Sequence, residues 1–469
     1  MYFSISSWLI AFFIWLRRSF LFSSSIGAKI KDNCLLFMLA SVKRIVLSYG
    51  FAVWLWAFLF ARVPLAVIQE YSGLASRPFV LINIISLCIA FFVGFDRGLK
   101  NFAMFNYRSI SLVLGPFVVF WLIYFFRLGF DSYLQPIEFI ETPFSLSKSF
   151  VISTLIPVLC LPWIFSIRSN ADSLVICSVL GNISVLTGII AFFNKSIIMD
   201  FNIHDTRLHF EDLNPIPAGH SSASLVILGI ILLLYAHKKN YSFGLKFIYF
   251  ISIMSIFLGL WGVRLSQTRS AYIALLPVII FCFCQLWKEI RYRWLLISVA
   301  SLCSAWALPI KRTFTNGLLL QDDNVAERVR MFTAVWEWIC AHPFFGVGFN
   351  LQSLLNSLSN TTGSHWYPHN IFLDTYGIGG LLLFIPLLVF AFSLCRSIWF
   401  QFLSGQFCNE LYLVLAFLWI QSLFLSCFSG HMTLLPGFWV GGLMLPLACA
   451  RDKNFGACAN SSPVNIEIP

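Results

Sequence analysis

Long apolar stretches that recur along the whole chain restrict its fold more than any other feature. Of the 469 residues, 59% are hydrophobic and only 11% are charged, whereas soluble domains carry roughly 25% charged residues. A helix needs about 20 mainly apolar residues to cross the hydrocarbon core of a bilayer. Because such a helix satisfies its own backbone hydrogen bonds in lipid, the sequence predicts an all-α polytopic membrane protein.

Twelve membrane-spanning helices are expected from these stretches. They are placed at 48–69, 78–96, 109–127, 147–167, 172–193, 219–236, 243–262, 271–287, 294–309, 371–395, 411–428 and 436–450. The shorter apolar stretch at 5–16 lacks a small-residue cleavage site, which indicates an interfacial helix or an extra span and no cleaved signal. The expected division is a basic cytoplasmic or interfacial segment at 1–45, a transmembrane domain at 46–450 that carries the predicted site, and a cytoplasmic tail at 451–469.

Basic residues in the short connections set the orientation. The basic residues of the short connections lie at 97–108, 168, 238–239, 288–293, 396 and 451–453. All of these connections fall on one side of the predicted membrane. Positive charge marks the cytoplasmic side, so both termini are expected there. The opposite, outer face carries the connections 194–219 and 263–270 and the long segment 310–370, for which a large helical loop is expected. Long connections of this kind are usually functional.

Cysteine usage and net charge exclude other classes of protein. Thirteen cysteines lie mostly in apolar stretches and show no paired CxxC spacing, so core packing is expected in place of a metal site or a disulfide framework. The net charge of +11 is explained by the membrane, and no nucleic-acid partner is expected. The motifs of P-loop nucleotide enzymes, HExxH zinc proteases and GxSxG hydrolases are absent from the sequence.

Arginines on the outer face contradict the usual charge bias and therefore indicate a ligand. The outer basic residues are Arg207, Arg264, Arg269, Lys311, Arg312, Arg328 and Arg330. A guanidinium grips phosphate oxygens at two points, so a lipid diphosphate is the predicted partner. The turn at 264–270 is expected to place Arg269 at the N-terminal end of the following helix, where free N–H groups and the helix dipole favour anions.

Polar residues at 364–370 lie where the long outer loop meets an apolar helix. His369 is the predicted catalytic residue, because histidine suits proton transfer near neutral pH and polar groups at this depth are costly unless used. Asn370 is expected to orient it or a sugar, and Tyr367 offers a flat face for sugar contacts. His209 and His220 are interpreted as plain loop histidines, since two prolines at 215 and 217 are expected to break any helix before Gly219.

An amphipathic helix is expected upstream of this loop. Phe332, Val335, Trp336 and Ile339 fall on one predicted face. Pro343 is expected to stop this helix, and the glycines of Gly346-Val347-Gly348 permit a sharp return.

Three motifs in order resemble the O-antigen ligase and polymerase family of bacterial membrane glycosyltransferases. The motifs are Thr268-Arg269-Ser270-Ala271 at a helix start, Arg328 followed by Pro343 to Gly348, and Pro368-His369-Asn370 with Gly377 to Gly380. Arg207 before Asn214-Pro215 also looks like the family's pattern, although the order of that Asn-Pro pair departs from it. The resemblance spans about 200–395. It implies a GT-C-like fold in the bacterial inner membrane, with the active site facing the periplasm.

The resemblance also implies an activity. A ligase of this family transfers a glycan from undecaprenyl diphosphate to the lipid A–core, and a polymerase transfers it to another carrier-linked repeat unit. The ligase is favoured here, because Lys311, Arg312 and Arg330 suit an anionic acceptor, although a polymerase could use them too. The competing class is a transporter of lipid-linked glycans, which would more often show mid-membrane broken helices and inverted repeats.

The expected mechanism uses no metal and no cofactor. The leaving diphosphate gains negative charge, which Mg²⁺ or arginines can stabilise. Apart from Glu211-Asp212 and Asp322-Asp323, the outer loops hold no compact acidic cluster. Diphosphate binding is therefore assigned to Arg207 and Arg269, with Arg264 and Arg328 in support. His369 acts as the general base in a single displacement that inverts the anomeric centre.

Overall fold

The computed structural model describes most of the predicted membrane domain. The described residues are 31–72, 78–94, 107–134, 142–167, 171–198, 208, 215–235, 243–286, 323–358, 368, 370–404, 410–428 and 435–460. Within them the secondary structure is helical and contains no strand, as expected from the sequence. The predicted span at 294–309 lies outside the described residues.

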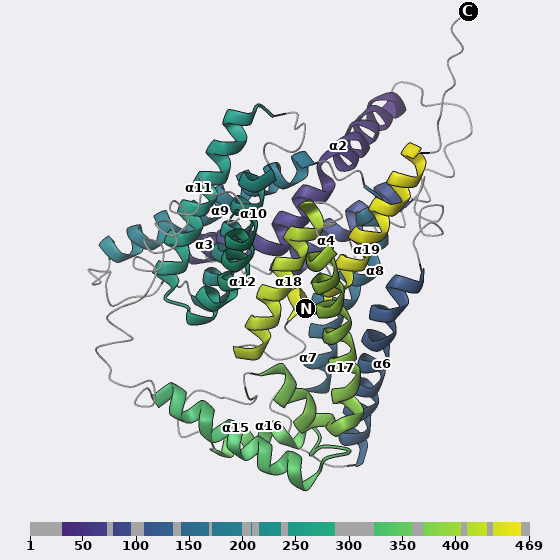
Figure 1. Cartoon of the computed structure of the whole chain (residues 1–469), viewed down its shortest axis with the longest axis vertical. Coiled ribbons are helices and arrows are strands. Elements are labelled where there is room, and N and C mark those ends of the chain that lie inside the picture. Colours follow the sequence, from purple (N-terminus) through teal and green to yellow (C-terminus); the bar gives the residue numbers. More distant parts are fainter. Residues whose placement is uncertain are drawn as a thin grey trace, which may run out of the picture.

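Figure 1 shows the arrangement of the described helices. They are α2 (Lys31–Phe60), α3 (Arg62–Ser72), α4 (Pro78–Gly94), α6 (Tyr107–Leu134), α7 (Pro143–Phe150), the π-helical turn η1 (Val151–Leu155), α8 (Ile156–Ser166), α9 (Ala171–Ile198), α10 (Pro215–Tyr235), α11 (Leu245–Ser266), α12 (Arg269–Leu286), α15 (Asp323–Ala341), α16 (Asn350–Leu358), α17 (Ile371–Ser404), α18 (Glu410–Phe428) and α19 (Pro436–Asn460). Because α2 runs through residue 45 and α19 through residue 451, neither predicted domain boundary coincides with a helix end, and the division stays a prediction.

Eight helical segments of the described chain are long and apolar enough to cross a membrane. They are Met38–Phe60, Ile110–Tyr133, Pro143–Phe165, Asp172–Ser196, Pro215–Leu234, Leu245–Ser266, Ile371–Phe402 and Glu410–Phe428, and the shorter apolar helices are Phe79–Val93, Ser270–Ile280 and Pro436–Ala448. Each of these overlaps a predicted span. The multi-pass fold is thus confirmed, whereas the total of twelve stays a prediction.

The first predicted span was placed too far along the chain. The apolar segment ends at Phe60, and Arg62 begins the separate helix α3. Helix α3 buries Val63 and Ala66 but also carries the polar residues Arg62, Gln69 and Glu70. The predicted range 48–69 therefore joined the end of a span to a short amphipathic helix that follows it.

Aromatic side chains fill the contact between α6, α17 and α19. Trp439 lies at the centre, with ring centroids 4.7 Å from Phe120, 5.2 Å from Phe390 and 5.3 Å from Trp121. Edge-on and tilted ring pairs of this kind add to the stabilisation from burial alone. They fix α17 and α19 relative to α6, and these helices carry or border the residues described next.

Candidate functional site

The turn between α11 and α12 begins the site. Gln267 adopts a left-handed conformation with φ of 49°, and its N–H donates to the carbonyl of Arg264 at 3.1 Å. Helix α12 then starts at Arg269, so the predicted position of this arginine at a helix N-terminus is confirmed. Arg264 is exposed on the last turn of α11. The side chain of Arg269 lies outside the described atoms.

The segment before α10 is tied to this turn. Leu208 is buried, and its N–H donates to the carbonyl of Leu265 at 2.9 Å. The Thr268 hydroxyl donates to the carbonyl of Pro215 at 3.0 Å. Arg207 itself is outside the described residues, but consecutive Cα atoms are about 3.8 Å apart, so its backbone adjoins Leu208. The chain segments that carry the predicted arginines 207, 264 and 269 therefore converge on one turn.

A buried hydrogen-bond cluster joins this turn to α18. His220 Nε2 lies 3.0 Å from the hydroxyl of Ser270, and its Nδ1 lies 3.3 Å from Gln421 Nε2. Gln421 Nε2 also donates to the His220 carbonyl at 2.6 Å, and the Ser224 hydroxyl lies 3.0 Å from Gln421 Oε1. Because an amide N–H donates to Nδ1, Nε2 carries the imidazole hydrogen and donates to Ser270.

The interpretation of His220 as a loop residue was therefore wrong. Helix α10 begins at Pro215, and both prolines lie in its first turn. Proline is well tolerated there, because the first N–H groups of a helix have no partner inside it. His220 is consequently buried one turn into the helix. His209 lies outside the described residues.

The C-terminal end of α18 contacts two further predicted residues. Asn370 Nδ2 donates to the carbonyl of Cys427 at 3.2 Å, while Asn370 Oδ1 accepts from the N–H of Phe372 at 2.9 Å and caps α17. Arg328 Nη1 donates to the carbonyl of Phe428 at 3.4 Å. Both side chains thus satisfy carbonyls that a helix end leaves unpaired. His369 and Tyr367 lie outside the described residues, although His369 is flanked by buried Pro368 and by Asn370.

Helix α18 links these two halves of the site. Cys427 follows Gln421 by six residues, which is about 9 Å along a helix that rises 1.5 Å per residue. The backbone next to His369 and the cluster that contacts the start of α12 therefore lie roughly two turns apart on one helix. The described neighbours of the predicted base and of the predicted diphosphate-binding arginine, Asn370 and Ser270, are thus both linked to the second half of α18.

Helix α15 and the turn after it lie beyond the ends of α6 and α17 (Figure 1). Helix α15 covers Asp323–Ala341, as the amphipathic pattern predicts, and buries Met331, Val335 and Ile339. Trp336 is 57% exposed, so the described residues bury only part of the predicted apolar face. Gly346 and Gly348 have φ of 65° and 71°, which confirms the sharp return expected there.

The turn after α15 is inserted into a break in α17. Gly380 has φ of 58° and ψ of −152°, so the helical hydrogen bonds are interrupted around it. Val347 N–H donates to the carbonyl of Gly377 at 2.8 Å, and Leu381 N–H donates to that of Pro343 at 2.9 Å. Buried Asp131 accepts the N–H of Phe349 at 2.8 Å. The turn therefore supplies the backbone partners that the broken helix lacks.

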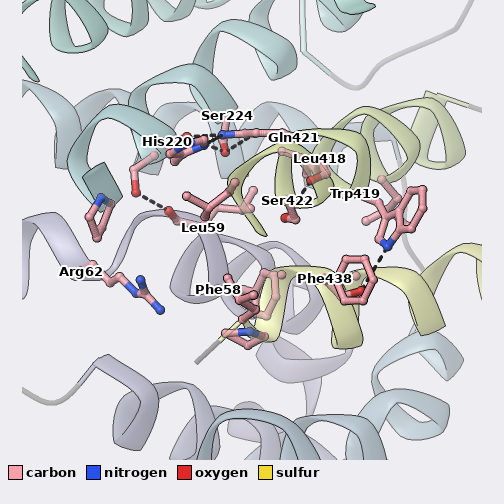
Figure 2. Close-up of a pocket in the computed structure, with 18 of the residues that line it drawn as sticks. Phe58, Leu59, Arg62, His220, Ser224, Leu418, Trp419, Gln421, Ser422 and Phe438 are labelled. Carbon is pink, nitrogen blue, oxygen red and sulfur yellow. Dashed lines mark hydrogen bonds between the residues drawn. The ribbon is translucent and has the colours of Figure 1, made fainter. Parts of the chain in front are cut away.

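A cavity of about 390 Å³ lies beside the His220 cluster (Figure 2). Its walls come from α2, α3, α10, α18 and α19 and are mainly apolar. Figure 2 shows Arg62 directed into this space from one side and the His220–Gln421–Ser224 cluster along another. The Arg62 guanidinium also lies over the ring of Phe79, 4.4 Å from its centroid. Arg62 was not among the predicted site residues, although a single arginine directly after an apolar segment is a usable signal.

Within the described residues, no three acidic, cysteine or histidine side chains lie close enough together to hold a metal ion. This count covers neither His369 nor the outer acidic pairs 211–212 and 322–323. Metal independence therefore stays a prediction.

These features define a multi-pass α-helical membrane protein whose predicted site residues belong to connections that meet at one end of the bundle. Residues 254–388 match the model of the O-antigen ligase family. This match supports the resemblance to that family seen in the motifs of the sequence. The match includes Arg264, Arg269, Arg328 and His369, whereas Arg207 and Arg62 precede it. No curated protein sequence matches the chain.

Proposed function

We propose that this protein is an O-antigen ligase that transfers a glycan from undecaprenyl diphosphate to the lipid A–core oligosaccharide at the periplasmic face of the bacterial inner membrane. The O-antigen ligase domain at 254–388 is the observation that carries this proposal. The convergence of residues 208, 265, 268 and 270 around one turn supports it, because arginines on these segments can reach one diphosphate.

The proposed reaction is one displacement at the anomeric carbon of the donor. The acceptor hydroxyl oxygen forms a bond to this carbon, and the bond from the carbon to the diphosphate oxygen breaks. His369 takes the proton from the acceptor hydroxyl, which typically contributes about 10²–10⁴-fold. Arg207 and Arg269, with Arg264 and Arg328 in support, bind the diphosphate as it leaves with the bonding electron pair.

Polymerisation of carrier-linked repeat units is the second candidate, because the matching family model does not separate the two activities. Both reactions use the same donor and differ only in the acceptor. The surplus basic residues Lys311, Arg312 and Arg330 suit the phosphorylated lipid A–core, which favours the ligase. The one-sided gathering of polar groups favours an enzyme over a transporter.

Deletion of the gene separates the two enzymes. If the protein is the ligase, the deletion strain accumulates carrier-linked polymer and its lipid A–core is bare on electrophoresis. Complementation with the wild-type gene restores the polymer on the core. Single repeat units attached to the core of the deletion strain would show that ligation is intact and that the chain is the polymerase.

A further inference from the structure

We propose that the cavity between α2, α3, α10, α18 and α19 holds the phosphate-bearing end of the polyprenyl carrier, and that Arg62 binds its phosphate. This inference rests on the proposed function and deepens it. It names where the lipid part of the donor lies and adds an arginine outside the matched family domain.

The cavity suits a single apolar chain. Its volume of about 390 Å³ falls within the range of roughly 300–1,000 Å³ that is typical of ligand pockets. Phe58, Leu418, Phe438 and Met444 line it, together with Gly441. A phospholipid would need space for two acyl chains attached to one headgroup, whereas an isoprenoid chain is single.

Arg62 lies where the phosphate of such a chain would be. It follows the Met38–Phe60 span by two residues, and therefore sits at the end of the apolar layer. Glu70, the acidic residue of the same helix, is bound by Lys195 at 2.6 Å. Among the described residues, Arg62 has no carboxylate within ion-pair distance.

The charge of Arg62 needs an anion. Burial lowers the pKa of Arg62 to about 10, which still leaves the guanidinium charged at neutral pH. A half-buried cation without a partner is costly, and stacking on Phe79 compensates only part of that cost. A phosphate oxygen supplies charge-assisted hydrogen bonds that no described residue gives to this guanidinium.

Two neighbours connect this position to the transfer site. Pro436 and Gly437, at the start of α19, line the same cavity, and the positive end of a helix dipole favours an anion there. His220 also lines the cavity and contacts Ser270, the residue after Arg269. A lipid phosphate at Arg62 would therefore lie beside the helix start predicted to bind the diphosphate.

Binding of undecaprenyl diphosphate and of undecaprenol to the full-length protein in detergent tests the role of Arg62. The variant Arg62→Gln should bind the diphosphate about tenfold or more weakly, because charge-assisted hydrogen bonds are lost, and should bind undecaprenol as the wild type does. The control Arg396→Gln removes another arginine that stacks on a phenylalanine, Phe400, and should leave both affinities unchanged. Wild-type affinity of Arg62→Gln for the diphosphate overturns the assignment.

A second pair of variants tests the cavity. A Cβ on Gly441 meets only Trp419, at 3.9 Å, so Gly441→Leu extends into the cavity without backbone strain. It should weaken binding of both undecaprenyl compounds at least tenfold. The control Gly129→Leu adds the same side chain at an exposed position of α6, where nothing lies within 4 Å of the Cβ, and should bind both normally. Unchanged binding by Gly441→Leu overturns the cavity assignment.

Competition distinguishes the source of the phosphate. Phosphatidylglycerol should not displace undecaprenyl diphosphate from the wild type, and equal competition would mean that the cavity takes phospholipid headgroups. Binding is measured without transfer, so this inference can fail while the proposed function stands. If the wild-type protein does not bind undecaprenyl diphosphate at all, the proposed donor fails as well.

Discussion

Asn370 and Arg328 each donate to a carbonyl in the last residues of α18. Asn370 uses its amide twice, because Nδ2 contacts Cys427 and Oδ1 caps the start of α17. Pro368, on the other side of residue 369 in the sequence, is buried. A base must be held within hydrogen-bonding reach of its proton donor, which gives the predicted role of His369 a testable requirement.

His369→Ala should abolish glycan transfer while the protein still accumulates in the membrane. Loss of a general base lowers the rate by about 10²–10⁴-fold, which would appear as bare lipid A–core on electrophoresis at equal protein level. The matched control is His342→Ala, because His342 is an exposed histidine at the end of α15. Near-normal surface glycan in the His369 variant would remove this residue from the mechanism.

Residues in short turns between apolar helices were the easiest to predict. Arg269 at a helix start follows from a short polar segment between two apolar ones, and the left-handed Gln267 confirms such a turn. Arg62 was missed because hydropathy alone does not separate a span from an amphipathic helix that directly follows it. His220 was misplaced because prolines in a first turn resemble a helix break in sequence. Its partners Ser270 and Gln421 are 50 and 201 residues away, and no local pattern predicts such contacts.

At the level of elements, the His220 cluster holds three helices together. His220 and Ser224 lie on α10, Ser270 on α12 and Gln421 on α18. Glycines allow α10 to pack closely against α11, since a Cβ on Gly259 would be 2.7 Å from the carbonyl oxygen of Ser222. The start of α12 is therefore positioned by buried polar contacts as well as by its own turn.

A double-mutant cycle at His220 and Ser270 tests this contact. His220→Phe and Ser270→Ala should each destabilise the protein by about 1–3 kcal/mol, because each leaves a buried polar group without its partner. The double variant should cost less than the sum, with a coupling energy of about 0.5–3 kcal/mol. Chemical unfolding in mixed micelles measures these values. Strict additivity would show that the 3.0 Å contact contributes nothing to stability.

The broken helix α17 is the other element that positions the site. The turn at 343–348 fills the break around Gly380 with hydrogen bonds to Gly377, Ile378, Leu381 and Leu382. The motifs Gly346 to Gly348 and Gly377 to Gly380 both belong to the predicted family pattern, but a contact between them was not predicted. The contact arises because each segment has backbone groups that only the other can satisfy, which is a tertiary property.

Gly380→Ala should separate the turn from α17. An alanine at φ of 58° and ψ of −152° is strained by about 1–3 kcal/mol, and its Cβ would overlap the backbone of Phe344. Lower thermal stability and faster proteolysis near residue 345 are the expected results. The control Gly129→Ala has nothing within 4 Å of the new Cβ and gains up to about 1 kcal/mol of helix propensity. Equal stability of the two variants would contradict the inserted-turn geometry.

On the scale of the whole molecule, several described connections lie close together. The turn at 267–268, the start of α10, helix α3 and the C-terminal end of α18 all adjoin the same cavity or the same buried cluster. Helices α15 and α16 lie beyond the ends of α6 and α17 (Figure 1). Which side of the membrane this end faces was predicted from basic residues in the opposite connections, and this assignment stays a prediction.

Thiol labelling tests the orientation through Cys340, which is exposed on α15. If this end faces the periplasm, a membrane-impermeant maleimide labels the protein in spheroplasts, and Cys340→Ser removes that labelling. Adding Ser357→Cys to the Cys340→Ser variant should restore it, because Ser357 is exposed on the neighbouring helix α16. Lys239→Cys in the same background should react only after permeabilisation, since residue 239 belongs to a predicted cytoplasmic connection. The reverse labelling pattern would show that the arginine-rich end faces the cytoplasm. The periplasmic lipid A–core acceptor of the proposed reaction is absent there, so that result would contradict the proposed function.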